Sequence, residues 1–221
     1  MKVFISAGHG GSDPGAVSGN VKEKDLNLSI ALACRDELVR HGVSVKMSRT
    51  KDENDPLSEE IKECNDYGPD LAVSIHNNAG GGDGAEVFYH YGGGKSKVLA
   101  ENVLEEIVKV GQNSRGAKIR KNSNGKDYYG FIRETSCPSV ILECAFVDNA
   151  TDRQILATEG KRNAMGVAIA KGILKALGVA YQGERATLYR VQVGAYFVKE
   201  NAEAMQKKIK AVGFDAFIVK E

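Results

Sequence analysis

The sequence predicts an α/β fold, in which a mixed, mostly parallel twisted sheet is flanked by helices and followed by a small C-terminal βαβ unit. Short apolar runs alternate with amphipathic helical patterns over residues 1–178. Glycine-rich stretches at residues 80–84 and 92–94 follow or separate such runs. This alternation favours strands covered by helices, and functional side chains are then expected where loops leave the strand ends.

Five segments of this region are predicted to be strands. Most are short apolar runs bounded by glycine, histidine or proline, and one alternates between apolar and polar residues. In chain order they are residues 2–6, 43–47, 70–75, 86–89 and 140–143.

Four segments have helical periodicity, at residues 25–40, 58–67, 97–110 and 161–177. Asp25 is expected to cap the first helix, and Gly42 follows its end. Residues 111–128 are polar, basic and nearly aperiodic, which predicts a long surface loop. The buried face of the first helix is expected to contain Leu28, Leu32, Leu38 and Val39.

The chain is expected to divide into a catalytic domain (1–178), a linker (179–186) and a small unit (187–221). Within the small unit, a strand (188–193), a helix (201–212) and a second strand (214–219) are predicted. A unit of this size buries too little apolar surface to be secure alone. We expect it to dock on the main domain, on a second copy or on a partner.

Composition excludes several classes of protein. Of 221 residues, 42% are hydrophobic and 27% charged, and the net charge is +1. These values are typical of a soluble globular protein and argue against a strongly basic nucleic-acid binder. No apolar stretch is long enough for a membrane span, and the first is too short for a signal peptide. We therefore expect synthesis in the cytoplasm without a signal peptide.

The four cysteines do not form a C-x-x-C pair, so a cysteine zinc site is not expected. We interpret Cys34, Cys64, Cys137 and Cys144 as buried, reduced thiols. A Cys137–Cys144 disulfide is only weakly supported without an export signal.

Two of the four histidines are candidate metal ligands. His9 and His76 follow predicted strands, whereas His41 ends a helix and His90 is expected at the surface. Two imidazoles need a third protein ligand for a catalytic zinc site with an open position. Spacing alone does not choose it, and two unrelated loop histidines remain an alternative. The acidic candidates are Asp13, Glu23, Asp25, Asp83, Glu86 and Glu143.

Glu143 stands out because it follows the apolar residues 139–142 and precedes Cys144. A carboxylate in this position either faces a pocket at a strand end or is buried at a cost. Two interpretations stay open: a buried ion pair with an arginine, or a general base with a raised pKa.

Four blocks occur in order along residues 1–178: FISAGHGGSDPGA, VKEKDLNLSIA, DLAVSIHNNAG and RETSCPSVILECAFVDN. Together they resemble the N-acetylmuramoyl-L-alanine amidase family usually called type 3. The resemblance implies a zinc enzyme that hydrolyses the amide between N-acetylmuramic acid and L-alanine in peptidoglycan. It implies that His9, Glu23 and His76 hold Zn²⁺ and that Glu143 is catalytic.

The C-terminal stretch LYRVQVGAYFVKENAEAMQKKIKAVGFDAFIVK resembles one half of a SPOR-type wall-binding repeat. The chain as a whole is similar to mother-cell lysis amidases and to some phage endolysins. The resemblance implies peptidoglycan as the partner, with action on the wall after release or lysis. A single half repeat predicts that two chains pair their small units as a homodimer.

Substrate contacts are expected from Asn77, which follows a ligand, and from Arg133, whose guanidinium suits a carboxylate of the stem peptide. Two other functions are weighed: a zinc peptidase that cuts within the stem peptide, and a non-catalytic wall-binding protein. A glycosidase would need paired carboxylates across a cleft, and the paired histidines give no support for one.

Overall fold

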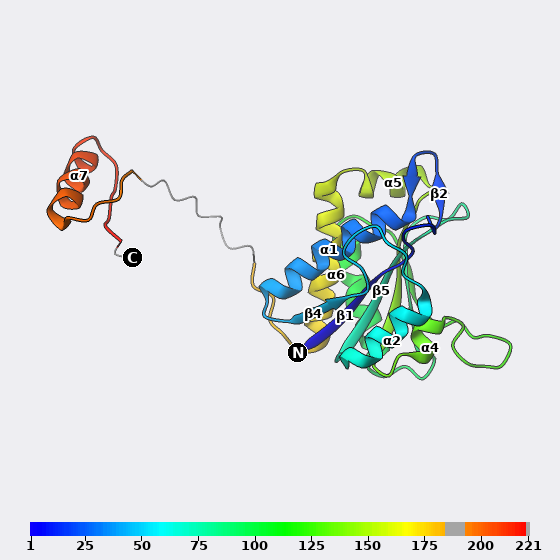
Figure 1. Cartoon of the computed structure of the whole chain (residues 1–221). Coiled ribbons are helices and arrows are strands. Elements are labelled where there is room, and N and C mark those ends of the chain that lie inside the picture. Colours follow the sequence, from blue (N-terminus) through cyan, green and yellow to red (C-terminus); the bar gives the residue numbers. More distant parts are fainter. Residues whose placement is uncertain (184–192, 220–221) are drawn as a thin grey trace. The chain divides into compact units, whose positions relative to one another are not determined.

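The chain forms two compact units, Met1–Gln182 and Gly183–Glu221. A computed structural model describes residues 1–183 and 193–219 (Figure 1). The boundary between the units lies within residues 179–186, the segment predicted to be a linker. The predicted bounds of the catalytic domain and of the small unit stay predictions. No helix among the described residues is both long and apolar enough to cross a membrane.

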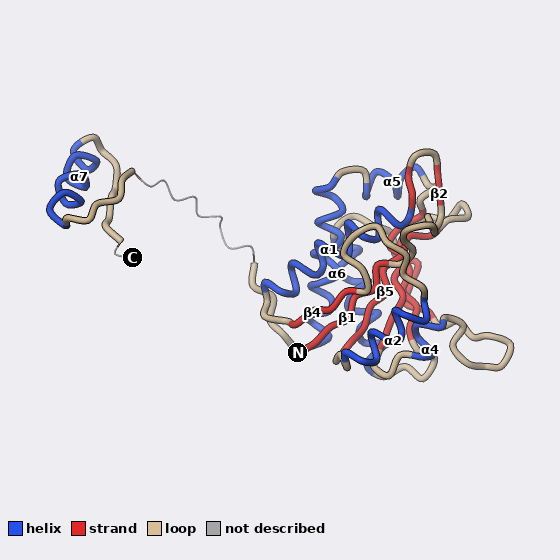
Figure 2. Tube along the Cα trace, in the orientation of Figure 1, coloured by secondary structure: helices blue, strands red, loops and turns tan. Residues whose placement is uncertain are grey.

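The first unit is built on a six-stranded sheet with strand order β4-β1-β5-β8-β6-β7. Figure 2 shows the strands of this sheet with helices on both sides. All neighbouring strands are parallel except β6 and β8, which are antiparallel. The predicted mixed, mostly parallel α/β fold is therefore confirmed. The strands are β1 (Lys2–Ala7), β4 (Ser44–Met47), β5 (Leu71–Asn78), β6 (Ala85–Tyr89), β7 (Ser114–Lys118) and β8 (Ser139–Phe146).

Helices cover both faces of this sheet (Figure 1). One face packs against α1 (Glu23–Arg40), α3 (Lys95–Lys109) and α6 (Glu159–Leu177), and the other against α2 (Leu57–Tyr67) and α4 (Gly130–Glu134). Successive strand residues point to opposite faces. In β1, Val3 and Ile5 accordingly enter the first core and Phe4 the second. Shorter elements are α5 (Ala150–Leu156) and the hairpin of β2 (Val17–Ser18) with β3 (Val21–Lys22).

Helix α1 begins earlier than predicted. It starts at Glu23, and its N-cap residue Lys22 makes no side-chain capping bond. Asp25 is not the cap but lies in the first turn, where its charge suits the helix dipole. Val39 is 54% exposed, which contradicts its predicted burial. The buried stripe instead runs through Ile30, Cys34 and Leu38 at i+4 steps.

Three predicted boundaries near the candidate site residues were wrong. β8 continues to Phe146, so Glu143 lies within the strand rather than at its end. β5 continues to Asn78, so His76 lies within the strand rather than after it. The predicted loop at 111–128 contains β7, which pairs with β6. The sequence prediction also missed β2, β3, α4 and α5, because elements this short carry no readable period.

All four cysteines are free thiols, as predicted, but Cys137 is only partly buried, unlike the other three. Cys144 is fully buried in the core beside α1 and α6, so the Cys137–Cys144 disulfide is absent. The sulfur of Cys137 instead lies 4.0 Å from that of Cys64.

The second unit contains α7 (Lys199–Ala211), which confirms the predicted helix. Residues 214–219 do not form the predicted strand. A strand needs hydrogen bonds to a neighbour, and the described residues offer none. Most of the other predicted strand, at 188–193, lies outside the described residues. No residue of α7 is buried, and Phe197, Phe214 and Phe217 are at least two-thirds exposed.

The buried carboxyl group of Glu60, on α2, predicts that the free energy of unfolding depends on pH. Glu60 on α2 is 5% exposed and accepts a 2.8 Å hydrogen bond from Ser6. Burial, assisted by Asp55, raises the pKa of Glu60 from 4.5 to about 7. Between these values the folded protein keeps a proton that the unfolded chain loses. The free energy of unfolding should therefore fall as pH rises through this window, by about 3 kcal/mol.

Urea unfolding at pH 5 and pH 8 measures this effect. The raised pKa values of Glu143 and His9 make the stability fall over part of the same range. Glu60→Gln should therefore lose the contribution of Glu60, about 3 kcal/mol, while Glu59→Gln, at an exposed neighbouring position, should keep the full pH dependence. An equal fall in stability in Glu60→Gln and the wild-type protein would contradict the assignment to Glu60.

Candidate metal and catalytic site

The loop after β1 brings His9 next to His76. His9 has a φ of 64°, a left-handed backbone conformation that is uncommon outside glycine. The preceding Gly8 lies against the ring of His76, where a Cβ would approach Cε1 to 2.1 Å. The two imidazole centroids are 4.9 Å apart with the rings nearly perpendicular. A glycine at position 8 is therefore required for the imidazole of His76 to reach this position.

Glu23, the first residue of α1, lies between the two histidines. Its carboxylate oxygens are 3.2 Å from His9 Nε2 and 3.0 Å from His76 Nδ1. One ligand atom from each residue lies within 4.8 Å of the others. Of the six acidic candidates, Glu23 is thus the one grouped with both histidines. Two imidazoles and one carboxylate form a donor set that suits a catalytic zinc ion.

The charges in this group fit a cation. The hydrogen bond to Glu23 is the main cause that raises the pKa of His9 to about 9, against the opposing effect of burial. Burial alone would raise the pKa of Glu23, yet hydrogen bonds from His76 and His9 hold it well below its usual range. The 4%-exposed carboxylate of Glu23 is therefore ionised, and a bound cation would replace the proton on His9.

A buried amide network holds Glu23 in place. The backbone N–H groups of Ala16 and Asn77 donate to its carboxylate at 2.8 and 3.1 Å. Asn27, one turn along α1, donates to Glu23 and to the Gly8 carbonyl. The Asn77 side chain, 2% exposed, donates in turn to Asn27. This supporting position was not foreseen for Asn77, and its substrate contact remains a prediction.

Asp13 orients His9 from outside the group. Its carboxylate lies 2.7 Å from His9 Nδ1, so the opposite nitrogen, Nε2, is directed at Glu23. Such partners fix the tautomer and orientation of a metal-binding imidazole. Asp13 is one of the acidic ligand candidates, but the structure places its carboxylate behind the His9 ring, at Nδ1.

The affinity for zinc is expected to fall about 10–100-fold in Asp13→Asn, because the amide orients the imidazole less strongly. Activity at saturating zinc should be largely retained. Competition with a chromophoric chelator measures the affinity, and Ser12→Ala is the matched control in the same loop. An unchanged affinity in Asp13→Asn would remove Asp13 from this role.

Glu143 on β8 lies beside the group, across from His76 in the parallel pair with β5. On its other side it faces Glu86 in the antiparallel pair with β6. Burial raises the pKa of Glu143 to about 8, and the charges of Glu23 and Glu86 add to the rise. Among the described residues Glu143 forms no ion pair, which excludes the predicted alternative of a buried arginine pair there.

Glu86 has the ionic partners that Glu143 lacks. Its carboxylate is 3.0 Å from Arg115 Nε and 2.5 Å from Lys118 Nζ. Both cations lie on β7, the strand that the sequence prediction missed, so periodicity gave no signal for this cluster.

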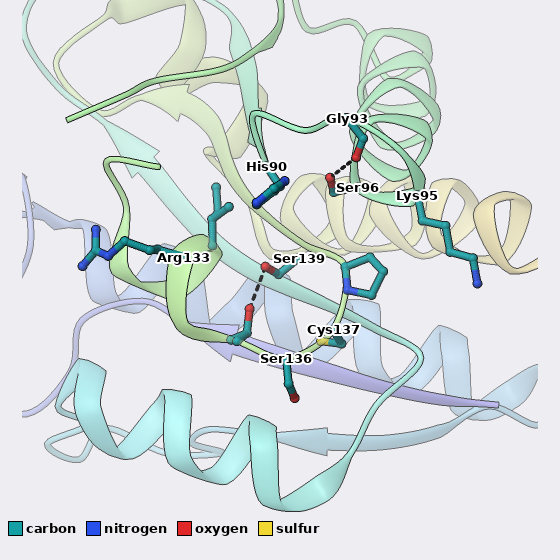
Figure 3. A pocket seen from close by; sticks show the side chains of 11 residues that line it. His90, Gly93, Lys95, Ser96, Arg133, Ser136, Cys137 and Ser139 are labelled. Carbon is teal, nitrogen blue, oxygen red and sulfur yellow. Dashed lines mark hydrogen bonds between the residues drawn. The ribbon is translucent and has the colours of Figure 1, made fainter. Parts of the chain in front are cut away.

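Arg133 is not brought together with these residues. It lines a separate cavity of about 250 Å³ with His90, Ser139 and others, and neither Glu143 nor any of the three grouped residues borders it (Figure 3). Its guanidinium donates to the carbonyls of Asp127 and Tyr128. Substrate binding by Arg133 remains a prediction.

The other two histidines lie apart from the site, as predicted. The His41 ring is stacked on Tyr181 and bonded to the Glu37 carbonyl. His90 is 3.3 Å from Asp127.

Two family models match the chain. The first, described as N-acetylmuramoyl-L-alanine amidase, matches residues 3–175. The second, the SPOR domain, matches residues 162–220.

Curated relatives match along almost the whole chain. N-acetylmuramoyl-L-alanine amidase CwlM of Bacillus licheniformis is 36% identical over 99% of this chain and 85% of its own length. The sporulation-specific N-acetylmuramoyl-L-alanine amidase of Bacillus subtilis is 34% identical over 99% of this chain and 84% of its own length.

Solved structures match the first unit. Cwp6 from Clostridium difficile is 38% identical with a TM-score of 0.78, over 80% of this chain and 29% of that one. The catalytic domain of CwlV, an amidase from Bacillus (Paenibacillus) polymyxa, is 31% identical with a TM-score of 0.73, over 81% of this chain and 99% of that one.

Proposed function

Because the chain belongs to the N-acetylmuramoyl-L-alanine amidase family, we propose that it is a zinc-dependent hydrolase of the amide between N-acetylmuramic acid and the L-alanine of the stem peptide. The observation that carries this proposal is the grouping of His9, Glu23 and His76 within 4.8 Å, with the half-buried Glu143 on the adjacent strand. Cleavage of this bond detaches stem peptides from glycan strands and so leads to lysis of the wall.

His9, Glu23 and His76 would hold zinc with three protein ligands, a number that leaves a position open. Zinc in such sites polarises the scissile carbonyl and acidifies water. The chain supplies the geometry, because Asn27 and the N–H of Asn77 keep Glu23 fixed.

Glu143 would act as general base and then as general acid. Its carboxylate accepts a proton from the attacking water and donates it to the amine of L-alanine as the amide breaks. The raised pKa of Glu143 suits both transfers near neutral pH. A cation held by the neighbouring ligands favours the ionised form that starts the cycle.

Metal removal tests the zinc assignment. Purified protein treated with a chelator should stop solubilising peptidoglycan and should regain activity on addition of about one equivalent of Zn²⁺. Magnesium, which prefers oxygen ligands, should not restore it. Full activity in the chelated protein, with zinc confirmed absent by elemental analysis, would contradict a zinc enzyme.

The C-terminal unit is proposed to bind glycan strands and to pair with a second copy in a homodimer. One support is the match to the SPOR domain. The other is the exposure of Phe197, Phe214 and Phe217, because a unit of this size buries too little apolar surface to shield these rings from water by itself. Relatives named as a sporulation-specific amidase and as an endolysin of a Bacillus phage are consistent with a lytic role after the protein reaches the wall.

Sedimentation velocity tests the pairing. The wild-type chain should shift from monomer to dimer with rising concentration, and Phe217→Ser should shift the equilibrium towards monomer. A single monomeric boundary over a wide concentration range would contradict a homodimer.

A further inference from the structure

A line of charged side chains crosses the sheet beside the proposed catalytic residue. His76 on β5 is paired with Glu143 on β8, and Glu143 with Glu86 on β6. The residues that flank Glu86 and Glu143 enter the core beneath α1, α3 and α6, as Val87 and Leu142 do. Alternation along a strand therefore places the charged side chains together on the other face.

The line ends in two cations on the edge strand β7. Arg115 and Lys118 both contact Glu86, and each of their side chains is 36% exposed, against 8% for Glu86. The Arg115 guanidinium also lies 5.0 Å from the ring of Phe146, at the end of β8. Arg115 also donates to the backbone carbonyl of Asp83. One carboxylate, that of Glu86, therefore holds two partly exposed cations beside the site.

The side of the metal-binding group that faces the loops after β1 and β4 is acidic, whereas the side that faces β7 is basic. The loops that follow β1 and β4 carry the acidic side chains Asp13, Asp52 and Glu53. Two lysines near these loops are already paired, Lys24 of α1 with Asp52 and Lys51 with Glu53. An anionic ligand bound at His76 and Glu143 would therefore extend towards β7 rather than towards β1.

We infer that the stem peptide extends from the metal-binding group across β8 and β6 towards β7, where Arg115 and Lys118 bind a carboxylate near the second residue of the peptide. This inference rests on the proposed function and names the orientation of its substrate. Arg115 supplies a planar fork for a carboxylate and Lys118 a point charge.

The distances between the strands agree with a carboxylate near the second residue of the peptide. Neighbouring strands lie about 4.8 Å apart, so β7 is about 10 Å from β8. The cations reach back to Glu86 on β6, which places their charged ends ~5–10 Å from the line of Glu143. An extended peptide advances ~3.4 Å per residue, so the first carboxylate they meet belongs to the second or third residue after the scissile bond.

Binding of the product peptide tests the inference without relying on catalysis. The probes are a stem tripeptide with L-alanine first and D-glutamate second, and the same peptide with the free carboxyl of that glutamate amidated. Calorimetry with zinc-loaded wild-type protein should give at least ~10-fold weaker binding of the amidated peptide, a loss typical of one charge-assisted hydrogen bond.

The double variant Arg115→Gln/Lys118→Gln should bind both peptides with the weak affinity of the amidated one. Lys97→Gln, which removes a cation from the surface of α3, should keep the full difference, and Lys118→Arg should keep most of it. Equal affinity of the wild-type protein for the two peptides, or a double variant that still discriminates between them, would overturn the inference.

Kinetics separate this inference from the proposed function. With muramoyl tripeptides as substrates, the double variant should raise KM for the free carboxylate form and leave the amidated form unchanged. A loss shared equally by both substrates would indicate a general defect and would overturn a role in carboxylate recognition. If the wild-type enzyme cleaves neither substrate but still distinguishes the peptides by calorimetry, the proposed function fails while the binding orientation stands.

Discussion

Glu143→Gln is expected to keep its zinc and to lose nearly all hydrolytic activity. Glutamine has the shape of glutamate but does not accept a proton from water at neutral pH. Proton transfer by a positioned side chain is worth about 10²–10⁴-fold in rate, so kcat should fall by at least two orders of magnitude. Because Glu143 is outside the group of three donors, the metal content should stay at one ion per chain.

Turnover of soluble muropeptides and elemental analysis measure the two quantities on the same preparation. Glu101→Gln, an exposed glutamate on α3, is the matched control and should retain wild-type activity. Substantial residual turnover in Glu143→Gln would remove Glu143 from its proposed role. Loss of zinc from this variant would instead assign Glu143 to the ligands.

His76→Ala is expected to lose both the metal and the activity. His76 supplies one of the three donors, and its ring contacts Glu23 at 3.0 Å. With only His9 and Glu23 left, zinc should dissociate at micromolar concentrations of chelator, and hydrolysis should fall to background.

His90→Ala is the control for this variant, because His90 lies in the separate cavity with Arg133 (Figure 3). It should keep both zinc and activity. A His76→Ala protein that holds zinc as tightly as the wild type would exclude His76 as a ligand, and full activity without zinc would exclude the metal from the mechanism.

The sheet was predictable because its central strands are apolar runs. β1, β5 and β8 are buried on both faces, so Val3, Val73 and Val140 belong to near-continuous hydrophobic stretches. The same property predicted His76 and Glu143 at strand ends, whereas both lie within their strands, which continue to Asn78 and Phe146. The sequence did not predict that the two residues are paired across β5 and β8, because strand order and register depend on long-range packing.

The spacing of residues in the sequence could not predict that Glu23 is grouped with the two histidines. Glu23 was one of six acidic candidates, and the resemblance to a family rather than any periodicity selected it. The contact depends on a left-handed turn at His9 and on the absence of a side chain at Gly8. Neither is visible in a hydrophobic pattern, and the support from Asn27 depends on how α1 packs against the loop.

The edge of the sheet was missed for a different reason. β7 reads SRGAK and has one half-buried alanine, Ala117, packed against the core. A strand with so little apolar content has no alternation to detect. Arg115 and Lys118, the two cations that contact Glu86, both lie on this strand.

Mass spectrometry of the fragments released from purified peptidoglycan tests the central claim most directly. The zinc-loaded enzyme should release free stem peptides that begin at L-alanine and leave glycan strands with an unsubstituted lactyl group. Fragments cut within the stem peptide, with L-alanine still joined to muramic acid, would contradict the account and identify the enzyme as a peptidase.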